Sequence, residues 1–152
     1  FEIESFQKIS DEYVKFYEKN FNNILLHDYV EESLKSVISL GSSQSILSAG
    51  NQGLLNNWLK SHDISQYFLH IIGVENHYAN GKIKQGLRLK ENLEFKNNEI
   101  VLVGDTIHDS EVAEEMGVDC ILVDHGHVNT QRLIKTGRIV QSSIRSVLEL
   151  IN

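Results

Sequence analysis

Residues 99–126 read EIVLVGDTIHDSEVAEEMGVDCILVDHG, and this stretch decides the fold class. The segments EIVLVGDT at 99–106 and DCILVDHG at 119–126 each contain a short continuous apolar run, which is typical of buried strands. Residues 110–117 between them end in glycine and have the composition of a short helix. A strand, a helix and a second strand in this order predict a parallel sheet covered by helices.

The same alternation extends to both sides of this unit. The periodicity of the apolar residues predicts the following elements: a helix starting after Ser10, a helix ending at a Gly41 cap, a strand at 44–48, a helix containing Trp58, a strand at 67–74, a helix interrupted by Gly86, a helix at 129–135, a strand at 139–141 and a closing helix from Ile144. The predicted class is therefore α/β, with a Rossmann-like parallel sheet and flanking helices.

The length and the charge limit the function. The chain has 152 residues, the size of one domain or most of one, with 14 basic and 21 acidic side chains. This acidic balance disfavours a basic nucleic-acid-binding face, and no apolar run reaches the ~18–20 residues of a membrane helix. The single cysteine, Cys120, excludes an internal disulfide and a multi-thiolate zinc site. We expect a cytoplasmic protein without nucleic-acid or membrane partners.

Residues with suitable chemistry follow the predicted strands. In open parallel sheets, ligands bind beyond the carboxyl ends of the strands. Ser48 and Ala49 follow the first strand, Asp105 and Asp109 follow the run VLVG, and Lys82 lies between strands in NGKIK. Carboxylates suit Mg²⁺, a hydroxyl with adjacent amides holds phosphate oxygens, and an ammonium balances phosphoryl charge. The set predicts a magnesium-dependent phosphoryl site.

Each of these residues also has a simpler explanation. Asp109 could only cap the 110–117 helix, and Asp105 could be a turn residue after glycine. The Ser48 hydroxyl could bond to the local backbone, and Lys82 could be one of many solvated lysines. Taken together, the residues favour the phosphoryl site over these separate explanations, because they follow successive predicted strands in the order that such a site needs.

That order resembles a known family. Ser48 after an apolar strand, then Lys82, then a Gly-Asp-x3-Asp motif containing Asp105 and Asp109 resemble the second, third and fourth motifs of the haloacid dehalogenase (HAD) superfamily of hydrolases. The continuation DSEVAEEMGVDCILVDHGH is similar to the phosphoglycolate-phosphatase-like branch. The likeness covers residues 25–150 or nearly so, and the Gly-Asp-x3-Asp strand and helix form its most specific part.

The resemblance implies a Mg²⁺-dependent phosphatase that acts on a small phosphorylated metabolite through an aspartyl-phosphate. Asp105 would bind Mg²⁺, and Asp109 would help directly or through a water. Ser48 and the amide of Ala49 would hold the phosphate oxygens that are not transferred. Lys82 would balance the negative charge of the phosphate and the nucleophile. Substrate identity lies beyond this sequence.

The chain departs from the family pattern at two places. Many members have proline after the motif lysine, where Ile83 stands here, so Lys84 is an alternative to Lys82. The family's first motif, an apolar strand ending in Asp-x-Asp, has no match in the chain. Residues 1–24 instead resemble the last helix of the helical cap that follows this motif. We therefore divide the chain into a cap remnant at 1–24 and a HAD-like core at 25–152 without its first strand.

This division has a physical consequence. In the family, the first strand lies between the strands predicted here at 44–48 and 99–104. Without it, two strand edges keep unpaired backbone groups, which is costly and favours association with another strand. We expect a chain that is inactive by itself and that self-associates through these edges or is completed by another segment.

Two other functions remain open. A non-catalytic regulatory module on the same fold would keep the Mg²⁺ and phosphate contacts without turnover. A receiver-like signalling domain would carry an acidic pair after its first strand, whereas Ser48 ends the strand that follows Gly41. The serine therefore disfavours the receiver. The segment encoded upstream of Phe1 distinguishes the enzyme from the module, because only the enzyme needs Asp-x-Asp there.

Overall fold

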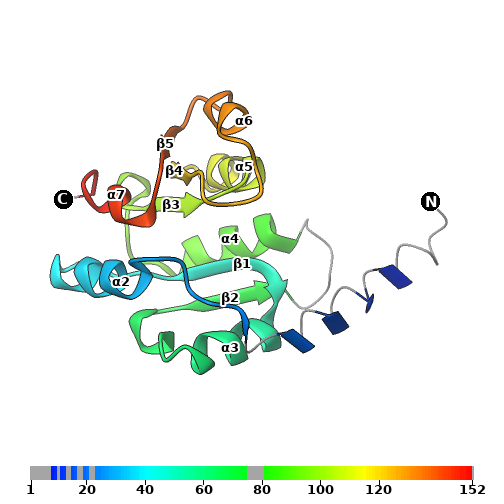
Figure 1. Cartoon of the computed structure of the whole chain (residues 1–152). Helices are drawn as coiled ribbons and strands as arrows, with labels where there is room; N and C mark the ends of the chain where they lie inside the picture. The colour runs from blue at the N-terminus through cyan, green and yellow to red at the C-terminus, as the bar shows by residue number, and fades with distance from the viewer. Residues whose placement is uncertain are drawn as a thin grey trace.

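The structure, a computed structural model, describes residues 8–9, 11–12, 15–16, 19–20, 23–74 and 81–151. Strands and helices alternate along most of this chain (Figure 1). The helices are α2 (Val30–Ser39), α3 (Gln52–Ser61), α4 (Gly81–Asn92), α5 (Ile107–Met116), α6 (Thr130–Ile134) and α7 (Ile144–Leu148). The strands are β1 (Ile46–Asn51), β2 (Ile71–Val74), β3 (Val101–Gly104), β4 (Asp119–Val123) and β5 (Ile139–Gln141). The predicted α/β class is confirmed. Of the helix expected after Ser10, the described residues 11–12, 15–16 and 19–20 are helical, and the remainder falls outside the described residues.

Several predicted boundaries differ from the observed ones for local reasons. Residues 65–67 form a 3₁₀ turn, so β2 starts only at Ile71, although Leu69 still donates a backbone hydrogen bond to Gln44. Helix α5 starts at Ile107, earlier than predicted, because Thr106 rather than Asp109 caps it. The cap predicted at Gly41 is confirmed. Its φ is 78°, and the amides of residues 41 and 42 bond back into α2, as in a Schellman motif.

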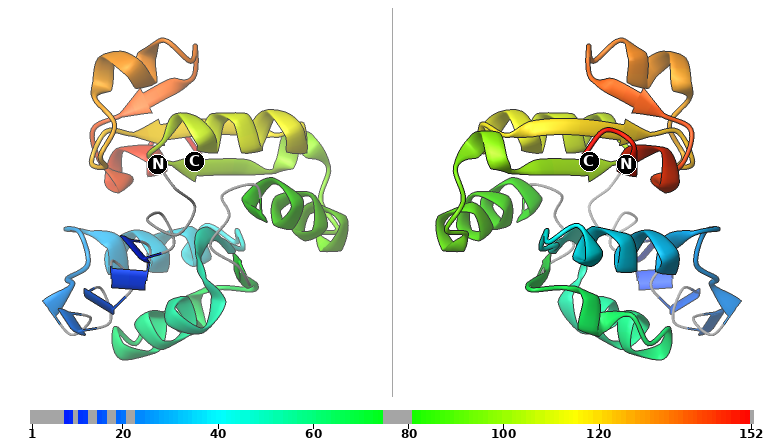
Figure 2. Two further views of the ribbon diagram at one scale, coloured as in Figure 1. Left: turned by 90° about the vertical axis from the view of Figure 1, so that its right-hand side faces the viewer. Right: turned by 90° about the vertical axis from the view of Figure 1, so that its left-hand side faces the viewer.

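All the strand pairs are parallel, but they form two sheets in the described part of the chain. β1 pairs with β2, and β3, β4 and β5 form a three-stranded sheet in that order. The two views of Figure 2 show the part from β3 onward, yellow-green to red, lying apart from the cyan and green part that contains β1 and β2. Among the described residues, no ladder joins β1 to β3.

The helices connect the two sheets. α3 and α4 pack against both strands of the first sheet, and α4 also packs against α5, which covers β3 and β4. α2 packs against α7. The main core lies between α5 and the second sheet and contains the following buried residues: Val112, Ala113, Met116, Val118, Cys120, Leu122 and Leu133. Among the described residues, no helix combines the length and the apolar character needed to cross a bilayer.

The residues of β3 are less covered than those of the neighbouring strand. Val101 and Val103 are 36% and 37% exposed, whereas the central residues Cys120, Ile121 and Leu122 of β4 are buried. β3 has one hydrogen-bonded neighbour strand in the described structure, and β1 likewise has one. Two unpaired parallel edges therefore flank the region between the sheets, and the one on β3 bears exposed apolar side chains.

Gly86 sits inside α4 because the helix approaches two other elements there. A Cβ atom at this position would lie 2.8 Å from the Met116 sulfur, 3.1 Å from a Leu47 methyl and 3.3 Å from a Val112 methyl. The glycine, which weakens the local helix propensity, thus lets α4 pack closely on β1 and α5. Lys82 lies one turn earlier on the same helix, so this contact also determines where Lys82 is held.

We expect Gly86→Leu to lower the free energy of unfolding by about 2–3 kcal/mol, because a large side chain overpacks the contact with Met116 and Leu47. Gly86→Ala should stay within about 1 kcal/mol, since the gain in helix propensity offsets the crowding of a flexible methionine. Urea denaturation followed by circular dichroism measures both changes. Lys84→Leu, at an exposed position of α4, is the control. Equal midpoints for the leucine variants at 84 and 86 would contradict the proposed packing.

Candidate active site

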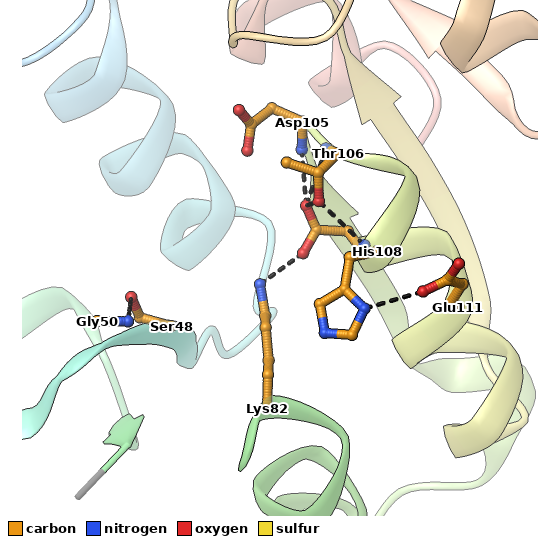
Figure 3. A network of polar contacts seen from close by, with 8 residues as sticks. Ser48, Gly50, Lys82, Asp105, Thr106, His108 and Glu111 are labelled. Atoms are coloured by element: carbon orange, nitrogen blue, oxygen red, sulfur yellow. Dashed lines mark hydrogen bonds and ion pairs between the residues drawn. The ribbon is translucent and has the colours of Figure 1, made fainter. Parts of the chain in front are cut away.

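The predicted site residues lie within β1, in the turn after β3 and on the first turns of α4 and α5. Figure 3 shows Lys82 extending from α4 toward the turn that carries Asp105 and Thr106, with Ser48 on the side of β1. Because all the strands are parallel to their neighbours, the turns that follow β3 and β4 leave the sheet side by side. The fold therefore presents residues from distant parts of the sequence to one region.

Ser48 lies inside β1 instead of after it, which corrects the predicted strand end. Residues 46 and 47 pair with β2, the pairing then shifts register, and it resumes only at Asn51 opposite Val74. Within the irregular stretch, the Ser48 hydroxyl accepts a hydrogen bond of 3.0 Å from the Gly50 amide. The backbone-bonding role considered for Ser48 is therefore present, and the hydrogen bond stabilises the irregular stretch at residues 48–50.

Asn51 continues this loop and was not singled out by the sequence pattern. Its side-chain oxygen accepts hydrogen bonds from the amides of Gly53 at 2.9 Å and Leu54 at 3.2 Å, and it caps α3. An Asn followed by a helical apolar pattern is the signal that indicates such a cap. The cap joins the end of β1 directly to α3, so the position of Ser48 is constrained on both sides.

Lys82 and Asp109 form an ion pair across the interface of α4 and α5. Their Nζ and Oδ1 atoms are 2.5 Å apart, and the side chains are only 14% and 4% exposed. Lys84, the alternative motif lysine, is exposed on α4. The structure therefore places Lys82, not Lys84, next to the acidic motif.

The second oxygen of Asp109 organises the turn after β3. Oδ2 accepts hydrogen bonds from the Asp105 amide at 3.1 Å, the Thr106 amide at 3.0 Å and the Thr106 hydroxyl at 2.7 Å. Thr106 in turn caps α5 by accepting a hydrogen bond from the Asp109 amide. Asp109 is thus not merely a helix cap, the simpler explanation considered for it: its carboxylate joins the end of β3, the start of α5 and Lys82.

A close approach of the backbone makes this arrangement possible. A Cβ atom at Gly104 would lie 2.4–2.6 Å from Asp109 side-chain atoms, so only glycine fits beside the folded-back carboxylate. The Gly in the Gly-Asp-x3-Asp motif therefore has a steric reason in this chain. It lets the Asp109 side chain lie directly over the end of β3.

The pKa of Asp109 lies below its usual range. Burial opposes ionisation, but the charge of the Lys82 ammonium and the hydrogen bonds from Lys82 and Thr106 outweigh the cost of burial. Asp109 is therefore an anion at neutral pH. Its negative charge is largely neutralised within the protein, by the Lys82 ammonium and by hydrogen bonds from the Asp105 amide and from Thr106.

The Asp105 carboxylate differs from that of Asp109. It is partly exposed and makes no hydrogen bond or ion pair with the described residues, while its backbone is held by Asp109. In Figure 3 its oxygens point away from the hydrogen-bonded turn. Such a carboxylate fits Mg²⁺, which binds through one or two protein carboxylates and takes water or phosphate oxygens for the rest. No cluster of three or more acidic, histidine or cysteine side chains suited to a metal occurs in the described part of the chain.

His108 is a further residue near this turn to which the sequence pattern assigns no role. Its Nδ1 atom lies 2.9 Å from Glu111, one turn further along α5, and its Nε2 atom is buried without a partner among the described residues. The pair borders the Lys82 side of the site in Figure 3. The spacing of three residues on a helix is the signal for such a pair.

The comparison with protein families identifies the architecture. The model described as haloacid dehalogenase-like hydrolase matches residues 1–123. The chain belongs to this family. The matched part of this haloacid dehalogenase-like hydrolase includes Ser48, Ala49, Lys82, Asp105 and Asp109. No curated protein matches the chain.

Solved structures support the same fold for this haloacid dehalogenase-like hydrolase. A haloacid dehalogenase-like hydrolase from Streptococcus pneumoniae superposes with a TM-score of 0.84 at 17% identity, covering 100% of this chain and 72% of the other. A predicted phosphatase from Clostridium acetobutylicum gives 0.87 at 20% identity, with 99% and 71% covered. A predicted phosphoglycolate phosphatase from Haemophilus somnus gives 0.83 at 16% identity, with 100% and 69% covered. At these identities the likeness establishes the fold.

Proposed function

We propose that this chain forms the phosphate- and Mg²⁺-binding part of a phosphatase that acts on a small phosphate monoester. The observation that carries the proposal is the ion pair of Lys82 with Asp109 beside the Asp105 carboxylate, which has no partner among the described residues. An ammonium that is held in place and a free carboxylate at the same edge of a sheet suit a substrate with several negative oxygens and a divalent cation. Membership of a hydrolase family and the phosphatase names of the structural neighbours support it.

The side chains would share the work as follows. Asp105 would hold Mg²⁺. A bound Mg²⁺ ion would neutralise part of the negative charge of the phosphate. Ser48 and the Ala49 amide hold phosphate oxygens, and Lys82 balances the negative charge of the phosphate and the nucleophile. Asp109 acts mainly by holding Lys82 and the Asp105 backbone, because three donors already occupy its Oδ2 atom.

The nucleophile, in this proposal, belongs to a strand outside these 152 residues that ends in Asp-x-Asp. Its first carboxylate attacks phosphorus, the bond from phosphorus to the leaving oxygen breaks, and the second aspartate protonates that oxygen. Water then hydrolyses the aspartyl-phosphate to free phosphate. An additional strand between the two sheets is supported by the exposed Val101 and Val103 and by the edges of β1 and β3, which no strand of the described residues pairs with.

The proposal extends to the partners and the location of the protein. In the absence of that strand, copies of the chain associate through the edges of β1 and β3, because unpaired backbone groups seek hydrogen-bond partners. The substrate is a small phosphorylated metabolite in the cytoplasm. The acidic composition supports the absence of a nucleic-acid partner, because no excess of basic residues is available to neutralise phosphates.

We expect the 152-residue chain to bind Mg²⁺ in isothermal titration calorimetry but not to hydrolyse p-nitrophenyl phosphate, because it holds the cation without a nucleophile. Asp105→Asn should abolish the binding. Asp119→Asn should preserve it, since Asp119 lies exposed at the opposite end of the sheet, where β4 begins. Equal affinity in the Asp105 and Asp119 variants would overturn the proposed metal site. Turnover by the unmodified chain that disappears in Asp105→Asn would overturn the proposed external nucleophile.

A further inference from the structure

The loop after β4 determines the space available to Asp105. A Cβ atom at Gly126 would lie 1.8 Å from the Asp105 Oδ2 atom, 2.7 Å from its Cγ and 2.8 Å from its Cβ. Asp105 therefore rests directly on the backbone of Gly126, twenty-one residues later in the chain. Any side chain at position 126 would occupy the volume that the carboxylate now fills.

The loop itself is held at both ends. The Asp124 amide donates a hydrogen bond of 3.0 Å to the Gln141 carbonyl, which extends the pairing of β4 with β5. The Asp124 carboxylate accepts a hydrogen bond of 3.1 Å from the Thr130 hydroxyl at the start of α6. Gly126 lies between these two attachments. A clash at this position is therefore relieved more readily by rotation of Asp105 than by a shift of the loop.

Asp105 has little else to fix the direction of its carboxylate. Its backbone amide is held by Asp109, but its side chain makes no hydrogen bond with the described residues. The side-chain torsions of Asp105 are thus limited mainly by what surrounds the carboxylate. Gly126 is part of those surroundings, and an added methyl group there would overlap the Asp105 Oδ2 atom.

We propose that Gly126 is a positioning residue for the Mg²⁺ ligand Asp105, an inference that rests on the proposed function. The bare backbone at 126 leaves room for the present orientation of the Asp105 carboxylate, in which its oxygens make no hydrogen bond with the described residues. An alanine there turns the carboxylate away while the strand, the turn and the ion pair of Lys82 with Asp109 remain. Gly126 thus acts on metal affinity through Asp105 and touches neither substrate nor metal.

The test measures Mn²⁺ binding to the folded chain by electron paramagnetic resonance, which detects the free ion. We expect Gly126→Ala to weaken binding at least about tenfold, the size of effect typical of groups that orient a metal ligand. His127→Ala, an exposed change in the same loop, should bind like the unmodified chain. Circular dichroism and urea denaturation establish that each variant is folded at the temperature of the binding assay.

The outcomes separate this inference from the function on which it rests. Binding that is lost in Asp105→Asn but unchanged in Gly126→Ala would overturn the positioning role and leave the metal site intact. Absence of binding to the unmodified chain, or equal binding to Asp105→Asn, would overturn both. Equal weakening by Gly126→Ala and His127→Ala would show a general effect of the loop and would also reject the specific role of Gly126.

Discussion

A chain extended at its N-terminus by an apolar strand ending in Asp-x-Asp, with the connecting cap helices, is expected to hydrolyse p-nitrophenyl phosphate in the presence of Mg²⁺. The gain over the 152-residue chain should be at least about a thousandfold, because removal of a catalytic nucleophile typically costs that much or more. The added segment can be taken from one of the structural neighbours. Release of nitrophenol is the measurement.

The controls for this experiment replace one carboxylate at a time. Asparagine at the first aspartate of the added segment, or at Asp105, should return the rate to that of the unextended chain. Asp119→Asn should leave the rate unchanged. If the extended chain folds and binds Mg²⁺ and inorganic phosphate but turns over no phosphate monoester, the chain is instead the non-catalytic regulatory module.

The second large effect is expected at Lys82. Lys82→Met should lower the free energy of unfolding at pH 7 by about 3 kcal/mol, because removing one partner of a buried ion pair leaves the other charge uncompensated. Asp109 is 4% exposed and keeps the donors of Thr106 but loses the ammonium at Oδ1. Urea denaturation gives the change. Lys84→Met, on the exposed face of the same helix, should change the free energy of unfolding by less than about 0.5 kcal/mol.

The pH dependence of this loss follows from the pKa of Asp109. The folded chain holds this pKa below its unfolded value of about 4, so the ionised pair contributes stability above that pH and loses it as pH falls through the folded pKa. In Lys82→Met, burial instead raises the pKa of Asp109. The difference in the free energy of unfolding between the unmodified chain and Lys82→Met should therefore be largest at neutral pH. It should shrink as acidification protonates Asp109 in the variant.

A double variant separates loss of the charge pair from loss of packing around the lysine stem. Adding Asp109→Asn to Lys82→Met removes the uncompensated charge while an amide oxygen still accepts from Thr106, so part of the stability should return at pH 7. A double variant no more stable than Lys82→Met, together with a pH-independent difference, would argue against the role assigned to the pair.

Local sequence patterns predicted the elements well but their ends less well. The apolar runs at 101–103 and 120–123 became β3 and β4, because continuous apolar residues in parallel strands are buried by helices. The start of α5 was missed because Thr106 and Asp109 both resemble caps in sequence. Only the hydrogen bond from the Asp109 amide to the Thr106 hydroxyl distinguishes them.

By itself, the sequence predicted the α/β class, the family and the set of candidate site residues, because strand alternation and the order of short motifs can be read along the chain. The tertiary structure alone decided that Lys82 rather than Lys84 meets Asp109, and that Asp105 rests on Gly126. These are contacts between residues twenty or more positions apart. Their geometry depends on how α4 packs on α5 and how the loop after β4 is anchored, which no local pattern of residues encodes.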